Sequence, residues 1–265
     1  MTTRIVQSKQ NPRVKELRAA LLRPGRKSSD LVALEGIHLL AEALRSQAKL
    51  ETVFLAEGHE SLLNEFELPA SLEVLALPRA VLDSAVTTES PQPIAALLRP
   101  RSWTWPDLFS PHSLLLVLSG IQDPGNLGTI LRSAEAFGAT GVLCLPGTVS
   151  PWNPKAMRAS TGSVFRIPLK EASAKACFEH LQQAGVRALA AMAHDAQSLG
   201  QHDLTHPIAL FIGAEGSGLS PELTAQCDAR ITIPCPGPVE SLNAAVAASI
   251  ILYEASKQRA KGGRA

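Results

Sequence analysis

The sequence predicts an α/β protein of two domains, and three observations support this fold class. Short apolar segments alternate with segments of helical periodicity along most of the 265 residues. A stretch rich in Pro, Ser and Trp separates a shorter half from a longer one. Apolar segments of the longer half end in glycine-containing turns, where open α/β sheets hold ligands. We expect domains at 1–100 and 113–265, joined by a linker at 101–112.

The first half reads as a small α/β domain. Residues 11–22 form a helix with Asn11 as N-cap and Pro12 at its first position. Residues 31–47 pass from a short strand through Gly36 into a second helix. Three further apolar segments are expected to be strands, at 51–57, 72–78 and 93–100.

Two tryptophans stand in the linker. Trp103 and Trp105 suit two roles, stacking on nucleic-acid bases and anchoring of the linker to a domain. The anchoring interpretation is favoured.

The second half has a more regular alternation. The expected strands are 114–120, 141–146, 164–169, 186–193, 207–215 and 229–234. The expected helices are 126–138, 153–160, 172–184, 221–227 and 241–258. Short apolar strands between helices indicate a mostly parallel sheet with helices on both faces.

Charge is distributed unevenly although the net charge is only +1. Residues 1–30 carry eight bases and two acids, residues 31–98 carry three bases and ten acids, and 151–170 is basic again. Local basic segments on a neutral chain favour a polyanionic partner such as nucleic acid, with a plain solvated surface as the alternative.

Several classes of protein are disfavoured. The first residues lack the apolar core of a signal peptide, and no apolar run reaches the length of a membrane span. The cysteines form no CxxC pair, which favours free thiols in the cytoplasm. GxGxxG, GxxxxGK[ST], GxSxG and HExxH are absent, so a small-molecule enzyme of those kinds has no support. The His- and Asp-containing segment 194–206 is interpreted as a polar loop and not as a metal site.

Helix 126–138 has an apolar face and a polar face at about 100° per residue. Asn126 and Arg132 lie on the polar face, and Asn126 lies where the preceding strand ends. Arg presents a rigid fork suited to phosphate. A surface pair of Arg132 with Glu135 explains the same pattern equally well.

Two other segments have special loop chemistry. Residues 213–218 form a glycine-rich turn after a strand, which permits positive φ and close approach of a ligand. Residues 234–240 contain three prolines and lead to Ser241 at a helix start, where Ser commonly acts as N-cap. The helix that follows is apolar on nearly all sides, which suggests a subunit interface as well as a core contact.

Together these segments resemble the SpoU/TrmH branch of the SPOUT RNA methyltransferases. The resemblance rests on NLGTILRSAEAFGA, GAEGSGL and IPCPGPVESLNAAVAAS, in that order, with PKAMRASTGSVFRIP between the first two. The segments at 11–22 and 33–44 are similar to the family's N-terminal substrate-binding domain, which is L30e-like. The resemblance implies an α/β knot, S-adenosylmethionine bound in that knot, a homodimer, and methyl transfer to a ribose 2′-hydroxyl of RNA.

It also implies roles for individual residues. The implied catalytic residues are Asn126, Arg132, Glu215, Ser241 and Asn243. The implied cofactor contacts are Gly213, Glu215, Gly218, Ile233 and Leu242. Basic residues expected to contact RNA are Arg13, Lys15, Arg23, Arg26, Lys27 and Arg158. No metal and no membrane partner are expected.

Free arginine is too basic to remove the ribose proton at neutral pH. We therefore expect Arg132 to grip a phosphate and stabilise the developing alkoxide, while the phosphate or water accepts the proton. The N-terminal domain favours ribosomal RNA over transfer RNA. The alternative is a non-catalytic RNA-binding or ribosome-assembly protein on the same scaffold.

Overall fold

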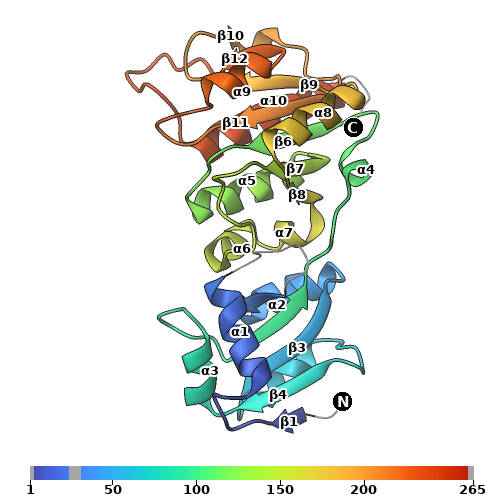
Figure 1. Ribbon diagram of the computed structural model, residues 1–265, viewed down its shortest axis with the longest axis vertical. Coiled ribbons are helices and arrows are strands. Elements are labelled where there is room, and N and C mark those ends of the chain that lie inside the picture. The colour runs from blue at the N-terminus through green and yellow to red at the C-terminus, as the bar shows by residue number, and fades with distance from the viewer. Residues whose placement is uncertain (1–2, 24–30, 262–265) are drawn as a thin grey trace. The chain divides into compact units, whose positions relative to one another are not determined.

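A computed structural model describes residues 3–23 and 31–261, which fall into two compact units. The first unit runs to Ser102 and includes residues 150–165, and the second comprises 103–149 and the chain from 166 onward. Figure 1 traces the elements of both units. Residues 150–165 of the expected second domain are grouped here with the first unit. The domain limits expected from the sequence stay a prediction.

The first unit contains a five-stranded sheet in the order β1-β4-β3-β5-β2. Its strands are β1 (Thr3–Ile5), β2 (Val32–Glu35), β3 (Lys49–Ala56), β4 (Glu73–Leu77) and β5 (Ile94–Arg99). Strand β5 is antiparallel to β2 and β3, and the other pairs are parallel. The helices are α1 (Pro12–Leu22), α2 (Ile37–Arg45), α3 (Arg79–Ala85) and α6 (Pro154–Ser160), with a 3-10 turn η1 (Glu60–Glu65). The predicted N-cap of α1 is confirmed, because Asn11 accepts a hydrogen bond from the Arg13 N–H.

The second unit contains a parallel seven-stranded sheet in the order β10-β12-β9-β11-β6-β7-β8. Its strands are β6 (Leu114–Leu118), β7 (Gly141–Cys144), β8 (Leu169–Glu171), β9 (Arg187–Ala191), β10 (Gln197–Ser198), β11 (Ile208–Ile212) and β12 (Ala229–Thr232). Its helices are α4 (Trp105–Leu108), α5 (Pro124–Ala136), α8 (Ala174–Gln183), α9 (Pro221–Gln226) and α10 (Ala244–Lys261), with a 3-10 turn η2 (Leu199–Gln201). The predicted parallel sheet is confirmed.

Burial on both faces explains the apolar strands of this sheet. All five residues of β6 are buried. Leu115 and Val117 belong to one core cluster with Leu108 of α4 and Leu181 of α8. The alternate residues of β6 point to the opposite face, and α5 and α10 contact each other in the same unit. Because the strands are parallel, the carboxyl ends of β9, β11 and β6 lie at one edge.

The prediction of a strand at 164–169 was wrong in part. Of the predicted strand 164–169, residues 164–166 belong to helix α7 (Ser163–Arg166), and strand β8 begins only at Leu169. Val164 and Phe165 are buried within a helical turn, and an apolar run this short does not distinguish a helical turn from a strand. The short edge strands β1 and β10 were not predicted at all.

The linker tryptophans are anchored to the second unit. Trp103 and Trp105 pack against its core, and the Trp105 ring stacks on His180 with centroids 4.0 Å apart. A capping box between Thr104 and Asp107 starts the short helix α4. The favoured anchoring interpretation therefore agrees with the structure. Among the residues described, no helix has the length and apolar character needed to cross a membrane.

Candidate active site

Three polar side chains from distant segments meet at the carboxyl edge of the second sheet. The Asn126 amide donates to Glu215 Oε1 at 2.9 Å, and the Asn243 amide donates to Asn126 Oδ1 at 3.1 Å. Asn243 also donates to Glu215 Oε1, and the backbone N–H of Ala244 reaches the same oxygen at 3.4 Å. We call Asn126, Glu215 and Asn243 the polar triangle. It ties the start of α5, the turn after β11 and the start of α10 together through one carboxylate.

The sequence fixes the first corner of the triangle through a helix cap. Helix α5 begins at Pro124, two residues earlier than predicted, with Asp123 as its N-cap. The Asp123 carboxylate accepts a hydrogen bond from the Asn126 N–H at 2.8 Å. Asn126 is therefore held in the first turn of α5, which follows β6 after a short loop.

The second corner depends on the glycine-rich turn at residues 213–218. A Cβ atom on Gly213 would lie 2.1 Å from the carbonyl carbon of Gly218, where there is no room for it. Gly218 has φ +66°, and its backbone exchanges two hydrogen bonds with Ala214. This folded turn places Glu215 at its tip.

The third corner, Asn243, is also the N-cap of α10, a role that the sequence had suggested for Ser241. Asn243 Oδ1 accepts from the N–H groups of Ala245 and Val246 at 3.0 and 3.1 Å. Asn243 is thus the capping residue of α10, and it uses its amide N–H₂ for the polar triangle. Ser241 lies outside the helix and is exposed.

A cavity of about 640 Å³ opens beside the triangle, a volume typical of sites for ligands of cofactor size. Its lining includes Gly213, Glu215, Gly218, Ile233 and Leu242, the residues expected to contact the cofactor. Ser241 lines it as well. The walls mix apolar side chains with backbone polar groups, a lining suited to an adenosine and an amino-acid chain together.

The loop after β9 contributes two cavity residues that the sequence interpretation had left in a plain polar loop. His194 and Asp195 line the cavity, and Asp195 has φ +54°. The signal that could have identified them is their place directly after a strand that neighbours β11. Within residues 3–23 and 31–261, no three His, Cys, Asp or Glu side chains gather as a metal site requires.

Arg132 lies apart from the triangle and does not line the cavity. It is exposed on α5, six residues after Asn126, which is about 9 Å along the helix axis. Glu135, its alternative partner in the sequence, instead binds Arg166 at 2.5 Å. The structure therefore brings together three of the five expected catalytic side chains, places Ser241 beside them and leaves Arg132 on the helix surface.

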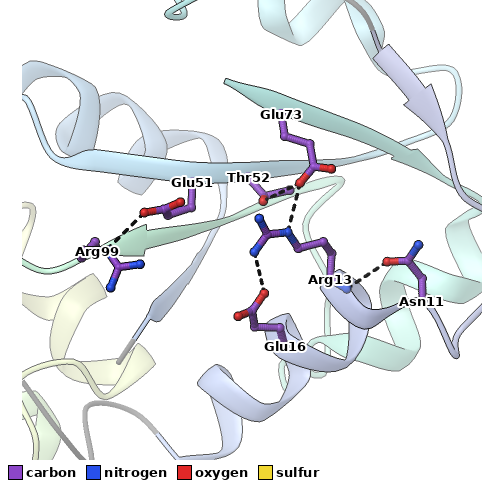
Figure 2. A network of polar contacts seen from close by, with 7 residues as sticks. All are labelled: Asn11, Arg13, Glu16, Glu51, Thr52, Glu73 and Arg99. Atoms are coloured by element: carbon purple, nitrogen blue, oxygen red, sulfur yellow. Dashed lines mark hydrogen bonds and ion pairs between the residues drawn. The ribbon is translucent and has the colours of Figure 1, made fainter. Parts of the chain in front are cut away.

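The residues expected to bind RNA differ in their exposure and in whether acidic side chains already bind them. Lys15 and Arg23 are exposed on or beside α1, and Arg158 is exposed on α6. Arg13 is engaged, as Figure 2 shows: its guanidinium donates to Glu16 at 2.8 Å and to Glu73 at 3.1 Å, and Thr52 donates to the same Glu73 oxygen. These partners raise the pKa of Arg13, the hydrogen bond to Glu16 most of all. Arg26 and Lys27 lie outside the described residues.

One base of the C-terminal segment is a structural residue. Arg259 is 7% exposed and donates to the backbone oxygens of His112, Ser113, Leu204 and His206 at 2.5–3.0 Å. Burial lowers its pKa. This arginine closes the end of α10 onto the loops before β6 and β11 and is not presented to a polyanion.

The cysteines are free thiols, as the sequence indicated. Burial raises the pKa values of Cys144, Cys177 and Cys227 to about 12. These three side chains are therefore protonated and unreactive at neutral pH.

Two family models match the chain. The SpoU rRNA Methylase family matches residues 113–253, and the MRM3-like substrate binding domain matches residues 11–96. The first covers the polar triangle, the cavity and Arg132, and the second covers most of the basic N-terminal helix and the five-stranded sheet.

Similar proteins span nearly the whole chain. A Synechocystis protein called an uncharacterized tRNA/rRNA methyltransferase is 35% identical, over 96% of this chain and 94% of its own length. The 23S rRNA (guanosine(2553)-2′-O)-methyltransferase of Bacillus subtilis is 29% identical, over 94% of this chain and 97% of its own.

Solved structures of methyltransferases resemble this chain over nearly its whole length. The SpoU methyltransferase AviRb of Streptomyces viridochromogenes, in complex with AdoMet, has a TM-score of 0.82 at 27% identity, over 95% of this chain and 99% of that one. An AdoMet-bound rRNA methyltransferase from Sinorhizobium meliloti has a TM-score of 0.82 at 31% identity, over 96% and 98%. This likeness confirms the α/β knot fold class expected from the sequence.

Proposed function

The chain belongs to the SpoU rRNA methylase family, and from this premise we propose that it transfers a methyl group from S-adenosylmethionine to a ribose 2′-hydroxyl of RNA. The observation that carries the proposal is the polar triangle beside a cavity of cofactor size. A scaffold that only binds RNA has no need to hold three segments around such a cavity.

The residues present fit the cofactor. Gly213 lets the turn fold tightly against the backbone of Gly218 and Leu219, and Gly213, Ile233 and Leu242 all line the cavity. When bound, the cofactor supplies a methyl group on a positively charged sulfur, so no metal is needed to activate the donor. The chain's own contribution to this step is alignment.

Glu215 is proposed to act as the organiser of the site. Its carboxylate accepts hydrogen bonds from both Asn126 and Asn243, so it fixes the cavity mouth against the start of α5. Asn126 and Asn243 hold that arrangement, and Ser241 lies at the cavity wall where the ribose must approach.

Arg132 is proposed to bind the RNA and to stabilise the reacting ribose oxygen. Its exposed guanidinium suits a bidentate contact with the phosphate next to the target ribose. The same charge stabilises the oxygen as its proton leaves, and the phosphate or a water molecule accepts that proton. A bound cofactor would supply the methyl group for this oxygen, and the part of Arg132 is to hold the oxygen and its phosphate in place.

We propose ribosomal RNA as the substrate. The match to a substrate-binding domain and the B. subtilis relative support this choice over transfer RNA. Lys15, Arg23 and Arg158 are exposed cations that suit the phosphate backbone. A ribosomal RNA substrate, together with free thiols, favours the cytoplasm as the place of action.

A homodimer is also proposed. Val246, Ile250 and Tyr253 of α10 are 47%, 37% and 54% exposed, at a spacing that puts them on one face of the helix. Ile251 and Leu252 of the same helix are buried. The helix thus serves the core with one side and has an apolar side left for a second copy.

The cofactor part of this proposal is tested by thermal melting and calorimetry. S-adenosylmethionine and S-adenosylhomocysteine should raise the melting temperature as ligand concentration rises, by mass action. NAD and ATP serve as controls and should leave it unchanged. A folded protein that responds to neither methionine compound, even with RNA present, would support the non-catalytic alternative.

A further inference from the structure

Glu135 on α5 is held by a two-point ion pair. Arg166 Nε donates to Glu135 Oε1 at 2.5 Å, and Arg166 Nη2 donates to Glu135 Oε2 at 3.0 Å. The side chains are 35% and 32% exposed, and both residues belong to the second unit. One planar guanidinium therefore engages both oxygens of this carboxylate.

Arg132 lies three residues before Glu135 on the same helix. Side chains at this spacing are neighbours on a helix surface, and opposite charges there attract. In the part of the chain that the structure describes, Arg132 nevertheless has no hydrogen bond or ion pair, whereas Glu135 is bonded to Arg166. The acid best placed to capture Arg132 is thus already engaged.

We propose that Arg166 is a positioning residue for methyl transfer. By engaging both oxygens of Glu135, it keeps the Arg132 guanidinium available for the RNA phosphate. This inference rests on the proposed role of Arg132. It explains why an acidic residue stands one turn from a group that must bind an anion.

The pairing geometry makes Arg166 hard to replace. A lysine at this position presents a compact charge and does not match the planar fork that spans both carboxylate oxygens. Loss of the positive charge removes both of these hydrogen bonds from Glu135, and its carboxylate then attracts Arg132 more strongly. An exposed ion pair of this kind holds its partners for only part of the time, so the effect on rate is moderate and not complete.

The test is a double-mutant cycle in the full-length protein, with single-turnover methylation at saturating RNA and cofactor. Arg166→Gln should slow the reaction roughly two- to sixfold, because an exposed ion pair with Glu135 would reduce the population of unpaired Arg132 by about that factor. Glu135→Gln should stay within about 1.5-fold of wild type, and the double variant should return to that level, as expected of coupled neighbours. A role limited to folding gives no such rescue.

A second readout does not depend on activity. Phenylglyoxal modifies accessible guanidinium groups, and mass spectrometry gives the modification rate at Arg132 itself. Arg166→Gln should slow modification of Arg132, and addition of Glu135→Gln should restore it. Arg166→Met keeps an unbranched stem without charge and should give the same result, so that a folding defect of one variant does not decide the outcome.

The outcomes separate this inference from the proposed function. If Arg132→Ala is as fast as wild type, the role of Arg132 is wrong. If Arg132→Ala is slow but both Arg166 variants match wild type in rate and in Arg132 modification, the positioning role is wrong. It is also wrong if the Arg166 variants are slow and Glu135→Gln fails to restore the rate, because Arg166 then acts on RNA directly.

Discussion

At the scale of single residues, Arg132 is proposed to act in methyl transfer and Gly213 to fix the shape of the glycine-rich turn. Arg132 is exposed on α5 and has no partner within the described residues, so Arg132→Ala should leave the melting temperature nearly unchanged. It should slow single-turnover methyl transfer by about 10²–10³, because one well-placed electrostatic group commonly contributes that much. Arg132→Lys should recover little of the rate. Equal rates for wild type and Arg132→Ala would remove this residue from the mechanism.

Gly213 sits where the glycine-rich turn folds back on itself. A methyl group there would lie 2.1 Å from the Gly218 carbonyl carbon, so Gly213→Ala must shift the turn. We expect a loss of about 1–3 kcal/mol in the free energy of unfolding, the usual cost of overpacking, and at least a tenfold weaker affinity for S-adenosylmethionine. Gly200 is the matched control, since a Cβ there meets nothing within 4 Å. Urea unfolding and calorimetry measure both effects, and unchanged cofactor affinity in Gly213→Ala would contradict the placement of the cofactor.

At the scale of elements, α10 carries two separate duties. Its end is fixed by Arg259, whose four backbone acceptors would lose a buried donor in Arg259→Ala. Unfolding free energy should fall by roughly 3 kcal/mol, since buried charged hydrogen bonds are costly to break. Lys257→Ala, an exposed change on the same helix, should alter it by no more than about 0.5 kcal/mol. Similar stabilities for the two variants would mean that the Arg259 contacts contribute nothing.

The middle of the same helix is proposed to form the dimer contact. Ile250→Glu places a charge on the exposed apolar face, which a free monomer tolerates and a buried interface does not. Sedimentation equilibrium should show a dimer for wild type and a monomer with native circular dichroism for Ile250→Glu. A wild-type monomer at micromolar concentration would overturn the proposed assembly.

Helix α1 is the element assigned to RNA docking. Lys15 and Arg23 are exposed, whereas Arg79 on α3 is paired with Asp83 and serves as the matched control. Replacing Lys15 and Arg23 with Ala should weaken RNA binding and reduce the slope of log affinity against log salt by at most about two. Arg79→Ala should leave that slope unchanged. An unaltered slope in the Lys15/Arg23 variant would assign another task to this helix.

At the scale of the whole molecule, the parallel sheet and most helices of the second half could be predicted from the alternation of apolar segments and caps. The helical turn Ser163–Arg166 could not be predicted, because a buried helical turn and a strand have the same apolar composition over four residues. The polar triangle joins residues 89 and 117 positions apart, which periodicity never brings together. The family resemblance pointed to those residues, but it did not show that Asn243 is also the helix cap.

The distribution of charge along the sequence was a poor predictor of which basic residues are available to a partner. Arg13 belongs to the basic segment 1–30, yet it is bonded to two carboxylates. Arg259, near the end of the chain, is buried among carbonyl oxygens. The Arg132–Glu135 pair was an equal alternative on the helical wheel, and only the position of Arg166 in space decides it. Which cations face a partner depends on tertiary contacts and not on their spacing along the chain.

The central claim is 2′-O-methylation of RNA by this chain, and one measurement addresses it most directly. Ribosomal RNA from cells lacking the protein is incubated with the purified protein and S-adenosylmethionine, digested to nucleosides and examined by mass spectrometry. The account predicts one additional 2′-O-methylated nucleoside, absent from the untreated RNA and from a reaction with Arg132→Ala. No incorporated methyl group, or a methyl group on a base instead of the ribose, would contradict it.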